Sequence, residues 1–470
     1  MLFPHLRNLT SDRKSMVVFD VRSASLLEVD YATAAVIEEA LMQQSLFDIS
    51  KRESSFMIDA GFDQLTIEAA YSKFAELITH NIIVDDNTGS RFAAADGQMK
   101  ITAVLLNISQ TCQLSCVYCF ASQGSFNDDK LFQPLMDMET GRKAIDFFFE
   151  IADPTADSYT VTFFGGEPML NWSLIQELTD YSESKAKAVS KKVVFAITSN
   201  GYMIDEEKVS FMAAHNIGCM ISLDGDEQTH NTLRPHKSTT VNSYEMASNA
   251  LKAIREVRDL ATARATVTSL CPDPVKLEQD MLNAGASRVN LQFISCLRDD
   301  PLALSHAQLR SYTQAATMRV FEGNLGRLYT QDISLLRLRN RHMSTRFCSF
   351  AESTMAIDAL GRIYACHRLV SDDNYLIGNI HSGLNVERVL AMKKMVNVDN
   401  RVGCRSCWAR YMCGGGCIAD YIIEVDNAPY TQSAQYCYYS RAVIQSLIEL
   451  YIEEVCSRLP EIVSDVPASV

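Results

Sequence analysis

Short apolar strands alternate with amphipathic helical stretches over the middle of the chain, and this alternation constrains the fold most strongly. Strand-like runs recur six times between residues 100 and 336, at 101–108, 159–164, 193–198, 217–223, 263–268 and 289–294. Six β/α units predict a parallel sheet with helices outside, closed or partly closed as a (β/α)6 TIM-like barrel of the α/β class. In such barrels the chemistry lies at the C-terminal ends of the strands, so residues after each strand are the candidates for a site.

The first 90 residues predict a separate small α+β module. Met16–Val21 and Leu26–Val29 predict a β-hairpin, and Asp30 is placed to cap the helix that follows. Thr66 is placed to cap a second helix, and Ile82–Val84 predicts a closing strand. This ββααβ order resembles the winged-helix-like peptide-recognition element found beside many peptide-modifying enzymes. An N-terminal elaboration without peptide contact is the alternative, and the polar run 85–98 predicts a linker.

Charge and hydropathy exclude two classes of partner. The formal net charge is −14, with 43 basic and 57 acidic residues, which argues against a nucleic-acid binder. The start has no apolar run of signal-peptide length, and no uninterrupted apolar run reaches membrane-spanning length, so we expect a cytoplasmic protein without a membrane partner. The 14 cysteines are then unlike a disulfide framework, because the cytoplasm keeps thiols reduced, and metal or cluster ligation is the better interpretation.

Three of these cysteines form a tight group directly after the first barrel strand. Their spacing is Cys112-x3-Cys116-x2-Cys119, with the aromatic Tyr118 before the last cysteine. Three thiolates can ligate three irons of a [4Fe–4S] cluster and leave the fourth iron open to chelate the amino and carboxylate groups of a methionyl moiety. A structural zinc site is the alternative, but it would require a fourth ligand. The motif and the barrel together resemble the radical S-adenosylmethionine (SAM) superfamily.

Further motifs follow the next strands in the order found in that superfamily. They are GGEP after the second strand, TSNG after the third, SLDG after the fourth, and an arginine in HNTLRP. By resemblance, the glycines let the backbone approach the SAM amino group, Glu167 is its negative partner, Asp224 contacts the ribose and Arg264 reaches the SAM carboxylate. The SAM-binding residues implied by the resemblance are Tyr118, Phe120, Gly165, Gly166, Glu167, Pro168, Thr198, Asn200, Ser222, Asp224, Arg234 and Arg264.

A second cysteine region occupies the C-terminal third. Seven cysteines there resemble the SPASM domain, which spans residues 345–445 and is followed by a helix and tail at 446–470. The resemblance implies two auxiliary [4Fe–4S] clusters, three clusters in all. The outer auxiliary cluster would be held by Cys404, Cys407, Cys413 and Cys437. The inner auxiliary cluster would be held by Cys348, Cys366 and Cys417.

The inner set has only three cysteines. Either Cys296 or a non-cysteine side chain completes it, or one iron is open. We favour the open iron, which can bind a substrate thiolate because thiolates are strong iron ligands that deprotonate on binding. The remaining cysteines, Cys219, Cys271 and Cys456, lack spaced partners and are expected to be structural.

Several segments sharpen the expected substrate. The runs CFASQGSF, METGRKAIDFFFE and YTVTFFGGEPMLNW, with the pair Cys366–His367, resemble radical SAM/SPASM maturases that install thioether cross-links, namely those of cysteine-rich peptides and of quinohemoprotein amine dehydrogenase. The resemblance implies a cysteine-containing precursor peptide or small protein subunit and an electron donor such as flavodoxin or ferredoxin. His367 can accept the cysteine proton, the alternative being a surface or hydrogen-bonded histidine. Sulfatase-maturing relatives carry an aspartate at that position.

Two other functions stay open at this point. One is a different SPASM modification of a peptide or protein: a C–C cross-link, an epimerisation or formylglycine formation. The other is an iron–sulfur electron-transfer protein without SAM chemistry, which would have no use for the open cluster, GGEP or SLDG.

Overall fold

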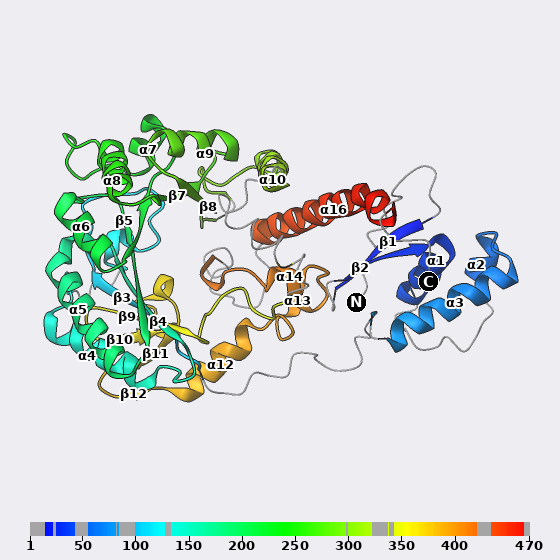
Figure 1. Cartoon of the computed structure of the whole chain (residues 1–470), viewed down its shortest axis with the longest axis horizontal. Helices are drawn as coiled ribbons and strands as arrows, with labels where there is room; N and C mark the ends of the chain where they lie inside the picture. Colours follow the sequence, from blue (N-terminus) through cyan, green and yellow to red (C-terminus); the bar gives the residue numbers. More distant parts are fainter. Residues whose placement is uncertain are drawn as a thin grey trace.

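The computed structural model describes residues 15–21, 25–42, 55–80, 82–83, 99–126, 133–297, 299–321, 337, 343–420 and 434–464. The molecule is elongated, with the large sheet and its helices at one end and the N-terminal module at the other (Figure 1). The cysteine-rich segments and the long helix α16 (Ala434–Ser464) lie between these two ends. Within the described residues, no helix combines the length and apolar character that crossing a membrane requires.

A ten-stranded sheet forms the main body, in the order β12-β11-β10-β9-β3-β4-β5-β6-β7-β8. All six predicted barrel strands are confirmed and pair in parallel. Their bounds are β3 (Ala103–Ser109), β4 (Ser158–Gly165), β5 (Lys192–Ser199), β6 (Gly218–Ser222), β7 (Thr262–Val267) and β8 (Arg288–Phe293). The C-terminal region extends the sheet beyond β3 with β9 (Thr354–Ile357), β10 (Arg362–Tyr364), β11 (Leu376–Asn379) and β12 (Gly383–Leu384). Because β9 pairs directly with β3, barrel and cysteine-rich region share one sheet.

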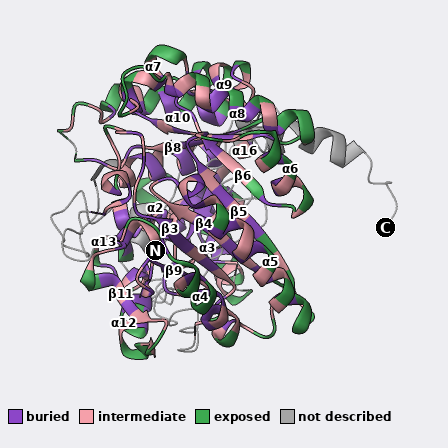
Figure 2. Cartoon of the chain, turned by 90° about the vertical axis from the view of Figure 1, so that its left-hand side faces the viewer, coloured by how far each residue is buried: buried purple, intermediate pink, exposed green. Residues whose placement is uncertain are grey.

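Helices cover the outer face of this partial barrel. They are α4 (Met138–Ile151), α5 (Trp172–Ala188), α6 (Glu206–Ala214), α7 (Glu227–Leu233), α8 (Ser243–Val257), α9 (Pro274–Asn283) and α10 (His306–Phe321). Side chains at 137, 205, 226, 242 and 273 cap five of them by accepting first-turn N–H groups. The buried residues concentrate between helices and strands, where the main hydrophobic core lies (Figure 2). The helices pack beside the strands, and the cavity lies at the C-terminal ends of the strands.

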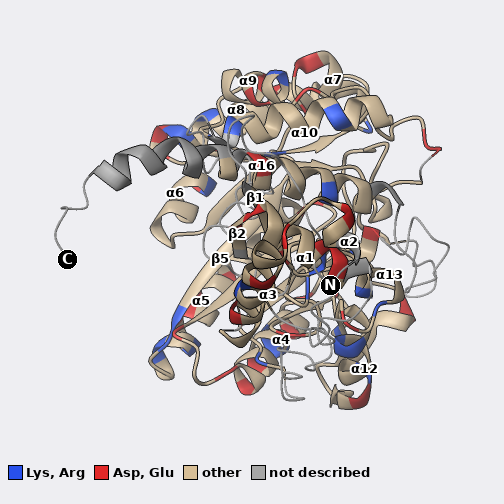
Figure 3. Cartoon of the chain, turned by 90° about the vertical axis from the view of Figure 1, so that its right-hand side faces the viewer, with Lys and Arg blue, Asp and Glu red and all other residues tan. Residues whose placement is uncertain are grey.

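The N-terminal module contains the predicted hairpin, β1 (Ser15–Asp20) and β2 (Ser25–Asp30). The helices α1 (Tyr31–Met42), α2 (Ser55–Asp59) and α3 (Gln64–Thr79) follow. Asp30 accepts the Thr33 N–H over 2.7 Å, which confirms it as the cap of α1. Among the described residues of this module acidic side chains far outnumber basic ones, and red predominates around α1 and α3 in Figure 3.

Two predictions for the module were wrong. Thr66 does not cap α3: Asp63 does, since its carboxylate accepts the Thr66 N–H over 2.9 Å. The predicted strand Ile82–Val84 is not formed at Ile82 and Ile83, and Val84 lies outside the described residues. Both isoleucine N–H groups donate instead to the carbonyl of Leu77, so the chain folds back on α3.

The module is anchored to the cysteine-rich region through β1. Phe19 packs edge-on against Trp408 at a centroid distance of 6.4 Å, and the same cluster includes Ile444 and Ile448 of α16. At its other end α16 packs on the barrel, where Tyr439 lies 4.1 Å from Phe293 between ring centroids. The helix begins at Ala434 and so crosses the domain boundary expected at 445. Three short helices complete this region: α12 (Val386–Val396), α13 (Val402–Arg405) and α14 (Arg410–Cys413).

Candidate active site

The cysteine loop, residues 112–119, follows the C-terminal end of β3. Backbone N–H groups within 115–117 donate to two carbonyls of the segment 233–235, over 2.8 and 3.0 Å. The ammonium group of Lys237 donates to the carbonyl of Cys112 over 2.7 Å. These hydrogen bonds join the loop to the segment 233–237 of the barrel, so contacts within the protein hold the loop in its conformation.

A buried ion pair anchors the aromatic residue of this loop. The carboxylate of Asp224, which is fully buried, accepts from Arg234 over 2.8 and 3.2 Å and from the Thr266 N–H over 2.9 Å. The Tyr118 hydroxyl donates to the same carboxylate, and the Arg234 guanidinium lies 5.3 Å from the Tyr118 ring centroid. Burial raises the pKa of Asp224, but Arg234 outweighs it and the net direction is down. The carboxylate of Asp224 therefore accepts hydrogen bonds from other residues of the protein and helps to hold the cysteine loop in place.

The three thiols of the loop suit a bound cation. The pKa of Cys112 is raised to about 12, mainly by burial, and the negative charges of Glu167, Cys116 and Cys119 act in the same direction. Burial also raises the pKa of Cys116, to about 11. Cys112 therefore lies within electrostatic reach of both other sulfurs of the loop.

The GGEP turn packs directly on the cysteine loop. A Cβ at Gly166 would lie 2.3 Å from the carbonyl oxygen of Thr111, and one at Gly165 would lie 2.1 Å from that of Ser109. Gly165 also has φ of +139°. Both positions therefore require glycine, because backbone approaches backbone at van der Waals distance.

Glu167 ties the end of β4 to the end of β5. Its carboxylate accepts from the Met169 N–H over 3.0 Å, the Ser199 hydroxyl over 2.9 Å and the Asn200 N–H over 2.8 Å. Burial raises the pKa of Glu167 to about 7 despite these bonds. Pro168 starts the short 3-10 helix Pro168–Asn171 behind it. Glu167 is thus a structural clamp at the cavity wall.

One cavity of about 190 Å³ lies at the C-terminal ends of the strands. The three cysteines of the loop and most of the residues that the sequence singled out for SAM line this cavity. These are Cys112, Cys116, Tyr118, Cys119, Phe120, Gly165, Gly166, Glu167, Thr198, Asn200, Ser222, Arg234 and Arg264. Pro168 and Asp224 stand behind the wall and do not line the cavity. Three residues of the cysteine-rich region also line the cavity: His367, Arg368 and Asp420.

His367 lies in an aromatic setting beside the cysteine loop. Its ring packs edge-on against Phe164 at 4.8 Å and against Phe120 at 6.3 Å between centroids. Burial lowers its pKa to about 3, and the positive charges of Arg368 and Arg264 act in the same direction. The imidazole is therefore neutral at pH 7, and its low pKa makes it a weak base.

Arg368 and Asp420 are cavity residues that the sequence did not single out. Arg368 pairs with Asp420, and it donates to Ser295 over 2.6 Å and to the sulfur of Cys417 over 3.4 Å. Each lies within three residues of a predicted cluster cysteine, and this nearness could have indicated both as candidate site residues. Arg264, which was predicted, has its pKa lowered by burial and by the nearby arginines.

Electrostatic coupling links cysteines within each of the two predicted sets. Burial raises the pKa of Cys366 to about 12, with Cys417 and Cys348 adding to the effect. Burial likewise raises the pKa of Cys437 to about 12, with contributions from the sulfurs of the outer set, Cys413, Cys404 and Cys407. Three consecutive glycines at 414–416 all have φ between +72° and +87°, which turns the chain from the outer set to the inner. Cys296 is buried in the main core.

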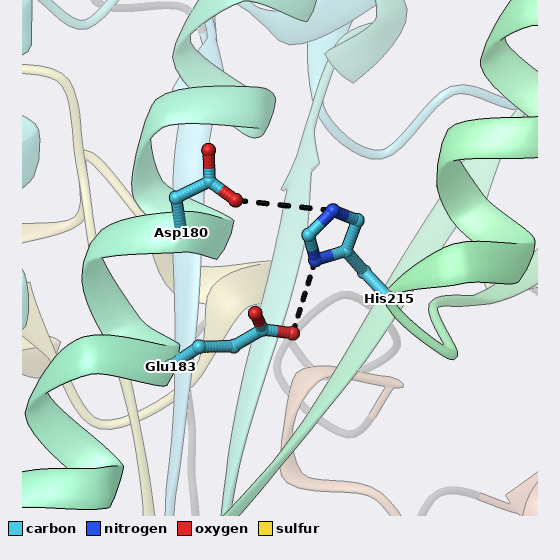
Figure 4. Close-up of side chains that lie close together, drawn as sticks. All are labelled: Asp180, Glu183 and His215. Atoms are coloured by element: carbon cyan, nitrogen blue, oxygen red, sulfur yellow. Dashed lines mark hydrogen bonds and ion pairs between the residues drawn. The ribbon is translucent and has the colours of Figure 1, made fainter.

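A separate group of metal-binding residue types lies outside the barrel. His215, at the end of α6, places Nδ1 3.1 Å from Glu183 and Nε2 3.8 Å from Asp180 on α5 (Figure 4). One ligand atom from each of the three side chains lies within 4.8 Å of the others, at the surface of the barrel. None of the three lines the cavity.

Comparisons with known proteins agree with this geometry. Residues 106–268 match the Radical SAM superfamily, and the described sheet has the partial-barrel fold of that superfamily. The chain is 20% identical to the radical SAM cyclopropyl synthase TigE of Paramaledivibacter caminithermalis, over 96% of both chains. It is 25% identical to the cysteine-type anaerobic sulfatase-maturating enzyme of Clostridium novyi, over 68% of this chain and 88% of that enzyme.

Two further matches differ in extent. An uncharacterized protein of Methanocaldococcus jannaschii is 30% identical over 135 residues, and the match spans 42% of its length. The solved structure of anSMEcpe with bound AdoMet and the Kp18Cys peptide superposes with a TM-score of 0.62 at 17% identity, over 76% of this chain and 99% of that one. At this identity the likeness concerns the fold alone.

Proposed function

Starting from a radical SAM domain at residues 106–268, we propose that this chain is an enzyme that forms thioether cross-links in a cysteine-containing precursor peptide or small protein subunit. The observation that carries the proposal is the shared cavity. Its wall includes the cysteine loop on one side and residues that adjoin Cys366 and Cys417 on the other. A carbon radical and a substrate sulfur can meet in such a space.

Cys112, Cys116 and Cys119 would hold a [4Fe–4S] cluster, and SAM would bind beside it in the cavity. When bound, the pair supplies a 5′-deoxyadenosyl radical that takes one hydrogen atom from a substrate carbon. The glycine backbone of the GGEP turn would border the SAM amino group, and Arg264 would face its carboxylate. Thr198, Asn200 and Ser222 would line the remaining SAM surface, as would Arg234 and Phe120.

Asp224 has a different proposed role from the ribose contact expected of it. Its oxygens already accept from Tyr118, Arg234 and the Thr266 backbone. We assign it to holding the cysteine loop, and we assign Glu167 to holding the ends of β4 and β5 together.

The second cysteine region would hold two auxiliary [4Fe–4S] clusters in the predicted sets. Thioether formation removes two hydrogens from the substrate, so one surplus electron must leave the site, and a chain of clusters provides a route to a flavodoxin or ferredoxin. The inner set counts three cysteines, which leaves room for a substrate thiolate as a ligand. Such reduced thiols suit a cytoplasmic location.

His367, Phe120 and Phe164 would shield the reacting carbon from water. A radical intermediate benefits from water exclusion, and these three rings form an apolar wall. We assign His367 to this wall, because its low pKa makes it a poor general base at neutral pH.

The N-terminal module would hold the leader segment of the substrate. Within the described residues its sheet has two strands, β1 and β2, and an extended peptide can add to the edge of such a sheet. Tethering raises the local concentration of the reacting segment.

A second candidate is carbon–carbon bond formation on a peptide. It is favoured by the relative that aligns over 96% of both chains, which is a cyclopropyl synthase. Either reaction removes two hydrogens, so mass alone does not separate them.

The test is anaerobic reconstitution with iron, sulfide, SAM and the cysteine-containing peptide encoded beside the gene. We expect 5′-deoxyadenosine, a peptide lighter by two hydrogens, and one fewer thiol that iodoacetamide can alkylate. A peptide that loses two hydrogens but keeps every thiol would replace the thioether with the carbon–carbon bond. No 5′-deoxyadenosine from the reduced, iron-loaded protein would refute SAM chemistry altogether.

A further inference from the structure

Arg368 occupies the junction between the two cysteine regions. It lies in the short 3-10 helix His367–Leu369, directly after Cys366, and its side chain is 17% exposed. Its guanidinium stands 5.2 Å from the ring centroid of Phe120, the residue that follows Cys119 of the cysteine loop. The same guanidinium reaches Ser295, just beyond the end of β8, over 2.6 Å.

The guanidinium also contacts a sulfur of the inner set. One of its terminal nitrogens donates to the Sγ of Cys417 over 3.4 Å. The backbone N–H of Asp420 donates to the same sulfur. A cation and an amide therefore both point at one thiolate position.

Asp420 counterbalances this cation. Its carboxylate accepts from Arg368 and from the Ser295 hydroxyl, so the three side chains form a closed triangle beside the cavity. The guanidinium of an arginine stays charged in proteins, so the triangle pairs a cation with a carboxylate.

We propose that Arg368 is a positioning residue for the inner auxiliary cluster, and that its hydrogen bond to Cys417 raises the reduction potential of that cluster. The inference rests on the proposed function, because it requires the inner cluster to exist. Hydrogen bonds to cluster sulfurs and nearby positive charge stabilise the reduced, more negative state. Asp420 opposes this effect by neutralising the guanidinium. The triangle therefore sets how readily the inner cluster accepts the surplus electron of the reaction.

The experiment uses the full-length chain with Cys112, Cys116 and Cys119 all replaced by alanine, so that only auxiliary clusters remain. Arg368→Gln, Arg368→Lys and Asp420→Asn are made in this background. Arg388→Gln is the matched control, since Arg388 lies on α12 of the same region and donates to the carbonyls of Asp373 and Asn374. The readouts are iron content and the midpoint potentials of the clusters in an anaerobic redox titration followed by electron paramagnetic resonance.

We expect Arg368→Gln to make reduction of one auxiliary cluster at least tenfold less favourable, a shift of about 59 mV for one electron, and to leave the other cluster unchanged. Asp420→Asn should shift the same cluster in the opposite direction, and Arg388→Gln should shift neither. Unchanged potentials in Arg368→Gln, with iron content intact, would overturn the proposal.

Variants that lose iron are also decisive. If Arg368→Gln loses one cluster while Arg368→Lys retains it, the positive charge is required, as proposed. If both variants lose that cluster, Arg368 has a purely structural role and the proposal is wrong. If the triple-alanine parent itself binds no iron, the auxiliary clusters do not exist, and the proposed function fails before Arg368 is tested.

Discussion

Cys112, Cys116 and Cys119 lie on one short loop, whereas Cys348, Cys366 and Cys417 come from three separate segments of the C-terminal region. The first set is held by backbone hydrogen bonds to 233–235 and by the buried ion pair of Arg234 with Asp224 behind it. The second set is brought together by tertiary folding, and its charged neighbour Arg368 faces the cavity. The comparison teaches that the loop is a rigid part of the barrel, while the inner set depends on how the C-terminal region docks.

The largest expected difference between the sets is in activity. Cys116→Ala should lower 5′-deoxyadenosine formation by roughly a thousandfold or more, because it removes a ligand of the proposed SAM-cleaving cluster. Cys417→Ala should leave 5′-deoxyadenosine formation within about tenfold of the unmodified protein while abolishing the cross-linked peptide. Chromatography of both products from one reaction measures this split. Equal loss of both products in Cys417→Ala would show that the two sets act as one site.

The ion pair behind the loop should dominate stability. Asp224→Asn leaves Arg234 buried without a full counter-charge, so we expect the free energy of unfolding to fall by about 3–5 kcal/mol. Glu177→Gln is a suitable control, because Glu177 pairs with Arg142 at the surface. Urea unfolding of the apo proteins measures both. A loss below about 1 kcal/mol for Asp224→Asn would contradict the view of a rigid loop anchor.

Glu167 gives the barrel site a pH signature. Its pKa is raised from the usual 4.5 to about 7. Well below pH 4.5 the Glu167 carboxyl is protonated in both the folded and the unfolded protein. As the pH rises toward 7, the carboxyl ionises first in the unfolded chain. The free energy of unfolding therefore falls by about 3 kcal/mol over that interval. Urea unfolding of apo protein at several pH values, compared with Glu167→Gln, measures the contribution. A difference between the two proteins that stays constant from pH 4.5 to 7 would refute the raised pKa.

The smallest expected effects come from single hydroxyl groups. Tyr118→Phe removes one charge-assisted hydrogen bond to Asp224 and should cost about 2 kcal/mol. Ser295→Ala removes the hydroxyl that joins Arg368 and Asp420 and should cost about 1 kcal/mol, since those two still pair directly. Thermal or urea unfolding checks both. A larger loss of stability in Ser295→Ala than in Tyr118→Phe would mean that the contacts among Ser295, Arg368 and Asp420 stabilise the fold more than the contact of Tyr118 with Asp224 does.

The sequence predicted the barrel and the cysteine loop well, for a local reason. Each barrel strand is a short apolar run, and each motif follows its own strand, so spacing along the chain carries the information. The cavity contacts of Arg368 and Asp420 could not be predicted in this way, because they depend on where β9 joins the sheet beside β3. The inward bonding of Asp224 was missed for a similar reason: Thr266 and Arg234 reach it from other segments.

The N-terminal errors have a different origin. Thr66 and Asp63 are both common helix caps by residue type. Asp63 is the cap in the structure, because its carboxylate accepts the Thr66 N–H. The run Ile82–Ile83 has strand composition, but its N–H groups are already satisfied by Leu77 at the end of α3. Propensity over two or three residues is too weak to outweigh such local bonds.

Helix α16 touches the barrel at Tyr439 and the N-terminal hairpin near Ile448 and Ile452. The helix between Tyr439 and Ile452 rises about 20 Å, a length that about six residues of extended peptide would span. Because a helix does not stretch, α16 fixes the distance between the barrel and the N-terminal hairpin. A substrate anchored at the module would present its reactive residue at a fixed count from the anchor, and the enzyme would select positions in a peptide by distance as well as by chemistry.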